Sequence, residues 1–278
     1  MFDMEKSQTK GARINMSYEL LTNILPIFHI VILCYVIIGS AQLIPKSNAS
    51  LLTVFFTFSM VSYLMSNLYW LAYTALRQDA RMPFAANEMG EWATYLLLAA
   101  ALSSIINKIP TVPISQIIFV WLLTVANVAL WIAWSGEWLQ DIITGLVMGY
   151  FLCTAVHAEY QTRSFTRKEL CYLCSTFVIA VVLQTSIFFV SDIIGTYINT
   201  ISYIVMLICI VFLYAKNLLA IKSHINTKAK LTLLFITFSS TITFLWMSDG
   251  IFYTIFLVSN MMLLPLMLEA LKQEVLNI

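Results

Sequence analysis

Long apolar segments separated by short polar connections occupy almost the whole chain. We expect nine helical segments, at about residues 20–43, 51–75, 90–107, 114–134, 139–160, 170–190, 194–215, 231–246 and 250–271. A membrane core about 30 Å thick is crossed by roughly 20 apolar residues in a helix, and most of these segments have that length. The alternating stretches of about ten residues that build a membrane barrel do not occur. The pattern predicts an all-α, polytopic integral membrane helical bundle with eight or nine transmembrane helices.

The number of spans depends on the eighth segment, residues 231–246, which is the shortest and could cross only part of the membrane. No linker or internal repeat divides the chain. Residues 1–278 are therefore predicted to form a single transmembrane domain, with a short polar tail at residues 1–18 and an amphipathic helix end at residues 268–278. Thr166 and Glu169 have the spacing of a capping box, which predicts the start of the sixth segment.

Composition supports a membrane location and excludes one class of partner. Hydrophobic residues make up 60% of the chain and charged residues 10%, which leaves too little polar surface to coat a water-soluble protein. Membrane lipids are the expected surroundings, and the plasma membrane of the cell is the expected location. The net charge is +1 and the basic residues are scattered over short loops, so we expect no nucleic-acid partner.

The distribution of loop charges predicts an orientation, because cytoplasmic loops are enriched in Lys and Arg. If nine segments alternate across the membrane, one side receives Lys46, Lys108, Arg163, Arg167, Lys168, Lys216, Lys222, Lys228, Lys230 and Lys272. The other side receives the N-terminal tail with Arg77 and Arg81. The first side is therefore predicted to be cytoplasmic, with the N-terminus outside and the C-terminus inside. Lys6, Lys10 and Arg13 in the tail argue for the reverse orientation.

Acidic and aromatic residues gather on the predicted outward side. The acids there are Asp79, Glu88, Glu91, Glu137, Asp141, Asp192 and Asp249, and the tryptophans are Trp70, Trp92, Trp131, Trp134, Trp138 and Trp246. Carboxylates and aromatic faces both attract cations, so we expect a small, positively charged ligand such as an amine to bind there. The expected ligand-binding residues are Glu88, Glu91, Trp92, Trp134, Trp138 and Asp141. The alternative is that the rings form an interfacial belt and that Asp192 and Asp249 cap helices.

One cysteine and one histidine before a predicted turn, and two cysteines after it, suggest a metal site. Cys153 and His157 lie one helical turn apart at the end of the fifth segment, and Cys171 and Cys174 lie about one turn apart at the start of the sixth. Folding the chain about residue 164 places the two pairs opposite each other, as a tetrahedral zinc site requires. A structural zinc ion is the one candidate cofactor. The alternative is ordinary packing, because a CxxC spacing alone is weakly specific.

Two function classes fit a ligand site in such a bundle. The first is a receptor or sensor whose C-terminal helix, apolar at residues 268, 271 and 275, contacts a cytoplasmic signalling partner. The second is secondary transport of a small molecule, with helices kinked at Pro26 and Pro265. Gly145 and Gly149 have the GxxxG spacing of a homodimer interface or of close packing inside one chain.

An intramembrane enzyme that acts on a lipid-like substrate is the third class. No HExxH, GxSxG or Walker motif is present, so we assign no catalytic residue and expect an enzyme less than a binding protein. Glu88, Glu91 and Asp141 would be the first candidates, because buried acids can act as general acids or bases. We favour ligand binding or sensing at the outward face, with transport as the second choice.

Overall fold

The computed structural model describes residues 24–47, 50–76, 86–106, 112–135, 138–222 and 226–276. It begins with a helix at Ile24–Ala41, called here the N-terminal helix. The following elements are α2 (Leu51–Leu76), α3 (Ala86–Ile105), α4 (Ile114–Ser135), α5 (Trp138–Thr162), α6 (Arg167–Ser186), the 3-10 turn η1 (Ile187–Phe189), α7 (Asp192–Lys222), α8 (Thr227–Trp246) and α9 (Gly250–Leu276). All regular structure in these ranges is helical. The predicted all-α bundle is confirmed.

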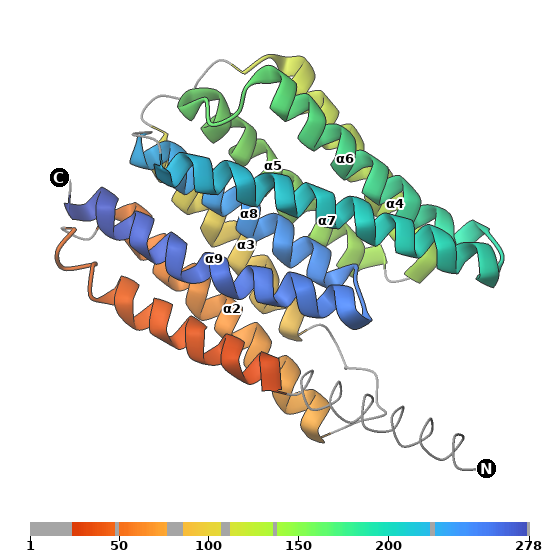
Figure 1. The fold of residues 1–278 in the computed structure, drawn as a ribbon, viewed down its shortest axis with the longest axis horizontal. Helices are drawn as coiled ribbons and strands as arrows, with labels where there is room; N and C mark the ends of the chain where they lie inside the picture. Colours follow the sequence, from red (N-terminus) through yellow and green to blue (C-terminus); the bar gives the residue numbers. More distant parts are fainter. Residues whose placement is uncertain are drawn as a thin grey trace, which may run out of the picture.

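The long helices run alongside one another and form a single bundle (Figure 1). α8 lies in the middle, where it packs against α3, α5, α7 and α9. α2 pairs with α3, α4 with α5, and α6 with α7. Hydroxyl-bearing residues of α8 donate to the carbonyl one turn earlier, as Thr232 does to Lys228 and Thr237 to Leu233. Such internal hydrogen bonds let a Ser- and Thr-rich helix occupy a bundle interior.

The outer surface of the bundle is apolar. On α7, Ile201, Ile204, Ile208 and Val211 are exposed, while Tyr203, Met206, Ile210 and Leu213 on the opposite side are buried. This arrangement suits a helix with lipid on one side and protein on the other. Eight helices in the described ranges are long and apolar enough to cross a membrane. The chain is an integral membrane protein by this measure.

The helix that falls outside those eight candidate spans is α3, not the eighth predicted segment. α8 is a complete helix of 20 residues, and α3 has the same length. α3 is less apolar because it carries Glu88 and Glu91. It lies against α2, α5 and α8, and Leu98 and Leu102 on it are fully buried. A helix enclosed by protein needs less apolar surface than one that faces lipid.

Glycines allow two helix pairs to approach closely. A side chain at Gly90 of α3 would lie 3.0 Å from the carbonyl oxygen of Ser62 on α2. A side chain at Gly145 of α5 would lie 2.1 Å from Val128 on α4, and one at Gly149 would lie 2.8 Å from Trp121. The GxxxG spacing therefore serves packing of α5 against α4 within one chain.

The apolar residues near the C-terminal end of α9 are covered within the chain. Leu268, Leu271 and Val275 are buried, whereas Glu269 is exposed. A side chain at Gly39 of the N-terminal helix would lie 2.6 Å from Leu268. The N-terminal helix therefore covers part of the apolar surface of α9 that was predicted to contact a signalling partner.

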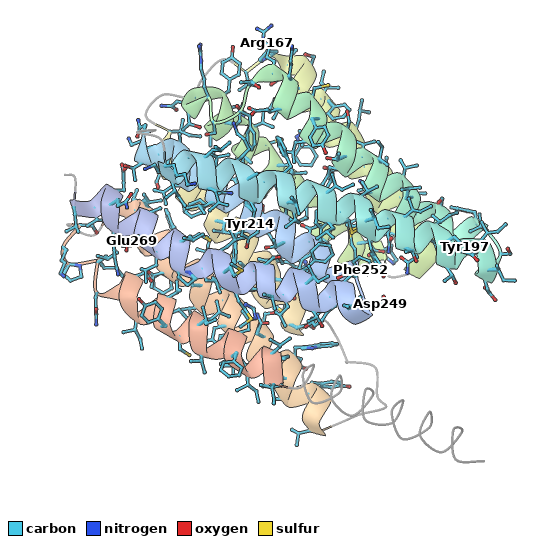
Figure 2. All side chains as sticks on the ribbon, viewed as in Figure 1. Arg167, Tyr197, Tyr214, Asp249, Phe252 and Glu269 are labelled. Carbon is cyan, nitrogen blue, oxygen red and sulfur yellow. The ribbon has the colours of Figure 1, made fainter. Side chains whose placement is uncertain are left out.

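Charged residues divide the bundle into two ends. The end where α9 finishes, called here the basic end, carries all Lys and Arg residues of the described ranges: Lys46, Arg163, Arg167, Lys168, Lys216, Lys222, Lys228, Lys230 and Lys272. The other end, called the acidic end, carries Glu88, Asp141, Asp192 and Asp249. Figure 2 shows Arg167 and Glu269 toward the first end and Asp249 and Tyr197 toward the second.

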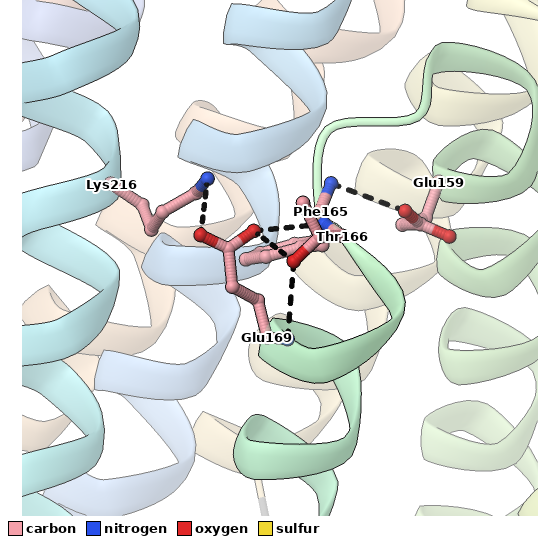
Figure 3. A network of polar contacts seen from close by, with 5 residues as sticks. All are labelled: Glu159, Phe165, Thr166, Glu169 and Lys216. Atoms are coloured by element: carbon pink, nitrogen blue, oxygen red, sulfur yellow. Dashed lines mark hydrogen bonds and ion pairs between the residues drawn. The ribbon is translucent and has the colours of Figure 1, made fainter.

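The predicted capping box at the basic end is confirmed (Figure 3). The Thr166 hydroxyl accepts from the Glu169 backbone N–H at 3.3 Å, and the Glu169 carboxylate accepts from the Thr166 backbone N–H at 2.8 Å. The other carboxylate oxygen of Glu169 forms an ion pair with Lys216 of α7 at 2.8 Å. Beside it, the buried Glu159 accepts from the Phe165 backbone N–H at 3.2 Å. These contacts fix the short α5–α6 turn against α7.

Candidate functional sites in the acidic half of the bundle

A buried polar cluster joins four helices in the half of the bundle nearer the acidic end. His29 of the N-terminal helix and Asn260 of α9 are hydrogen-bonded through Nε2 and Oδ1 at 3.0 Å. The Asn260 amide nitrogen donates to the Thr241 hydroxyl of α8 at 2.9 Å. Asn67 of α2 is also hydrogen-bonded to His29. The side chains of His29, Asn260 and Thr241 are all buried. They therefore form a hydrogen-bonded polar cluster in an apolar core.

Glu91 of α3 lies beside this cluster and is held by neutral donors. Its carboxylate accepts from the Ser66 hydroxyl of α2 at 3.2 Å and from the Trp246 indole at the end of α8. One turn further along α3, the Tyr95 hydroxyl donates to the Ser239 carbonyl at 3.0 Å. Glu91 therefore points into the bundle, toward α2 and α8, rather than outward over its end.

The predicted ligand-binding residues that the structure describes make contacts with different helices. The Trp92 indole donates to Thr144 of α5 at 2.9 Å, so Trp92 and its neighbour Glu91 point toward different helices. Trp138 is 60% exposed at the start of α5, as an interfacial belt residue would be. Glu88 and Asp141 are half-buried in the first turns of their helices. The side chain of Trp134 lies outside the described residues.

The predicted convergence of four zinc ligands is not found. Within the described ranges, which include Cys153, His157, Cys171 and Cys174, no three His, Cys, Asp or Glu side chains could hold a metal ion together. The reason is that α5 packs against α3, α4 and α8, while α6 packs against α7. The short α5–α6 turn therefore does not produce a packed hairpin. The His157 ring instead bonds the carbonyl of Cys153 at 2.7 Å.

A cavity of about 610 Å³ opens at the acidic end, where η1, the start of α7 and the start of α9 meet. We call it the acidic-end cavity. Its polar lining includes Asp192, Asn199, Tyr203 and Asp249, and its apolar lining includes Phe252. None of its lining residues is basic. Cavities of roughly 300–1,000 Å³ with a few converging polar groups are typical small-molecule sites.

Hydrogen bonds connect the polar groups of the cavity. The Asn199 amide nitrogen donates to the Tyr203 hydroxyl at 3.2 Å, and Tyr203 is in turn hydrogen-bonded to Asp249. The Asn199 amide oxygen is buried and has no hydrogen-bond partner among the described residues. The rings of Tyr203 and Phe252 pack with centroids 4.9 Å apart. The cavity thus presents two carboxylates and an aromatic wall.

The turn between α8 and α9 connects the cavity to Glu91. On one side of the turn, Asp249 lines the cavity. On the other side, Trp246 bonds to Glu91. The turn itself is held by Gln184 of α6, whose amide nitrogen donates to the Met247 carbonyl at 3.1 Å.

Sequence reasoning placed Asp192 and Asp249 on the outward side but missed their convergence, because it requires the α6–α7 and α8–α9 turns to be neighbours. Comparison with family models, curated proteins and solved structures finds no match to this chain. The described helices are those of an integral membrane bundle. A function is therefore inferred from the residues of this chain alone.

Proposed function

We propose that this protein binds a small cationic ligand, such as an amine or a quaternary ammonium ion, in the acidic-end cavity. The observation that carries the proposal is the lining of that cavity, which contains Asp192 and Asp249 but no basic residue. Two carboxylates in a lining that has no basic residue among the described positions create a negative potential that attracts positive ligands. The aromatic ring of Phe252 adds a surface that favours cations over anions.

The distribution of charge supports an outward position for this cavity. Every Lys and Arg of the described ranges lies at the basic end, and cytoplasmic loops are enriched in these residues. The basic end is then cytoplasmic and the acidic-end cavity faces the outside of the cell membrane. A ligand would reach the cavity from the exterior without crossing the bilayer.

Binding is tested by thermal stability of the purified protein with tetramethylammonium, choline and putrescine as probes. A ligand that binds only the folded state at 100 times its Kd stabilises by about 2.7 kcal/mol. The neutral choline analogue 3,3-dimethyl-1-butanol controls for shape without charge. We expect stabilisation by at least one cation and none by the neutral analogue.

Two aspartate substitutions locate the site. Asp249→Asn keeps the size of the side chain and removes its charge, so it should abolish the stabilisation by the cation. Asp141→Asn removes an acid from the same end of the bundle, outside the cavity lining, and should leave the response intact. Loss of the response in Asp141→Asn alone, or equal stabilisation by the neutral analogue, would contradict the proposal.

Uptake into proteoliposomes separates a sensor from a carrier. Accumulation of the stabilising cation would identify secondary transport, whereas binding without accumulation would identify a receptor. Trp138→Ala is not expected to change either result, because that ring is mostly exposed at the helix start.

A further inference from the structure

Glu91 is half-buried between helices, whereas the cavity acids Asp192 and Asp249 are exposed. It lies five residues after the start of α3 at Ala86, which corresponds to a depth of about 8 Å along the helix. Ser66 and Trp246 donate to its carboxylate from α2 and α8. Both donors are neutral, so they stabilise the carboxylate without balancing its charge.

The titratable groups around Glu91 do not supply the missing charge. Those with an electrostatic contact to it are Glu88 on its own helix, Tyr63 on α2, Tyr95 on α3 and Tyr253 on α9. From α8 the contact is the Trp246 indole, and the titratable residue of α5 at this end is Asp141. None of these residues is basic. A carboxylate in a low-dielectric interior costs several kcal/mol when it is left unpaired.

We propose that Glu91 is a binding site for an exchangeable monovalent cation, H⁺ or Na⁺, inside the bundle. Either cation neutralises the carboxylate where no Lys or Arg of the described ranges does. Oxygen ligands suit both cations, and the Ser66 hydroxyl already lies 3.2 Å from the carboxylate. The close approach of α3 to α2 at Gly90 also brings the Ser62 carbonyl oxygen to this interface. Ionisable residues inside membrane bundles characteristically lie on ion or proton pathways.

This site is separate from the acidic-end cavity, although the α8–α9 turn touches both. Asp249 at the end of that turn lines the cavity, while Trp246 before it bonds to Glu91. A cation at Glu91 and an organic cation at Asp249 would therefore act on the same short segment. The proposal does not depend on the proposed function, because Glu91 is not among the residues that line the cavity.

The test measures the stability of the purified full-length chain while Na⁺ replaces K⁺ at constant ionic strength, and separately while pH changes without Na⁺. If Na⁺ binds, stability rises with Na⁺ at fixed pH. If H⁺ binds, the folded protein holds a proton that the unfolded chain releases, so stability falls as pH rises. The unfolding equilibrium constant then changes by up to tenfold per pH unit for the one proton. Infrared spectroscopy adds a direct measurement, a protonated-carboxyl band.

Glu91→Gln imitates the neutralised carboxyl and should abolish whichever response the wild type shows, including the infrared band. Glu269→Gln is the matched control, because Glu269 is exposed at the basic end, and it should keep the response. Ser66→Ala keeps the carboxylate but removes one oxygen, so it should weaken the response without abolishing it. This second variant keeps the test informative if Glu91→Gln fails to fold.

A wild type with neither response, or a response that persists in Glu91→Gln, overturns the proposal. Failure here is distinguishable from failure of the proposed function. Asp249→Asn should lose stabilisation by organic cations while keeping the Na⁺ or H⁺ response, and Glu91→Gln should show the opposite pattern.

Discussion

His29 and Asn260 are 231 positions apart in the sequence, yet their side chains meet at 3.0 Å in the buried core. The bond joins the N-terminal helix to α9. Asn260 also donates to Thr241, so a single amide links three helices. A polar side chain with this many buried partners makes its position specific, because any shift of one helix leaves an unpaired group.

Asn260→Ala should therefore destabilise the bundle by about 1–3 kcal/mol, since it removes one buried hydrogen-bond partner from His29 and one from Thr241. The free energy of unfolding in detergent measures this change. Gln273→Ala, at an exposed position of the same helix, is the control and should be nearly neutral. The double variant His29→Leu with Asn260→Leu should recover part of the loss, because it removes both polar groups. An unchanged free energy of unfolding in Asn260→Ala would show that this polar cluster contributes little to stability.

Two glycines in helices should respond differently to the same substitution. Gly145→Ala places a methyl group where Val128 already lies, at 2.1 Å, whereas the nearest atom at Gly195 is 3.6 Å away. We expect Gly145→Ala to cost about 1–3 kcal/mol, through separation of α4 and α5. Gly195→Ala should be neutral or stabilise by about 0.5–1 kcal/mol, because alanine favours a helix. Equal midpoints of thermal unfolding for Gly145→Ala and Gly195→Ala would argue against the close α4–α5 contact.

The capping box at the start of α6 contributes a measurable share of local stability. Thr166→Ala removes the hydroxyl that accepts from Glu169 and should cost about 1 kcal/mol. Ser186→Ala at the other end of the same helix removes a hydroxyl that bonds the Leu183 carbonyl in the preceding turn, and its cost should be smaller. Hydrogen exchange of the α6 amides would report the difference. If the α6 amides exchange at the same rate in both variants, the capping box does not determine the local stability of α6.

The proposed orientation predicts which surface positions react from outside the cell. With the five native cysteines replaced, Thr196→Cys at the acidic end should react with an impermeant maleimide on intact cells. Lys168→Cys at the basic end should react only after permeabilisation. Both positions are exposed, so reactivity depends on the side of the membrane. The reverse pattern would place the acidic-end cavity on the cytoplasmic side.

Most of the fold could be predicted because segment length and apolarity determine which residues cross a membrane. The Thr166–Glu169 cap was also predictable, since it depends only on local spacing. The central position of α8 was not predicted, although its many hydroxyl residues were a signal. A helix that carries Thr232, Thr237 and Thr241 is less apolar than one built from Ile and Leu, and it is therefore less suited to face lipid.

The site was harder to predict, because apolarity does not determine how a membrane helix is rotated. Lipid and protein interiors are both apolar, so the pattern on α3 did not indicate that Glu91 faces α2 and α8 while Trp92 faces α5. The convergence predicted for the four zinc ligands is not seen among the described residues for a related reason. A short turn makes α5 and α6 antiparallel, but tertiary packing assigns each helix different neighbours.

The contact between Gly39 and Leu268 has a consequence for biosynthesis. α9 is made after the other described helices, so the N-terminal helix enters the membrane long before its partner. Until then, the surface that later covers Leu268 and the side chain of His29 face lipid or a chaperone. A ribosome that stalls before α9 would leave that surface open. The arrival of α9 thus completes the packing of the N-terminal helix.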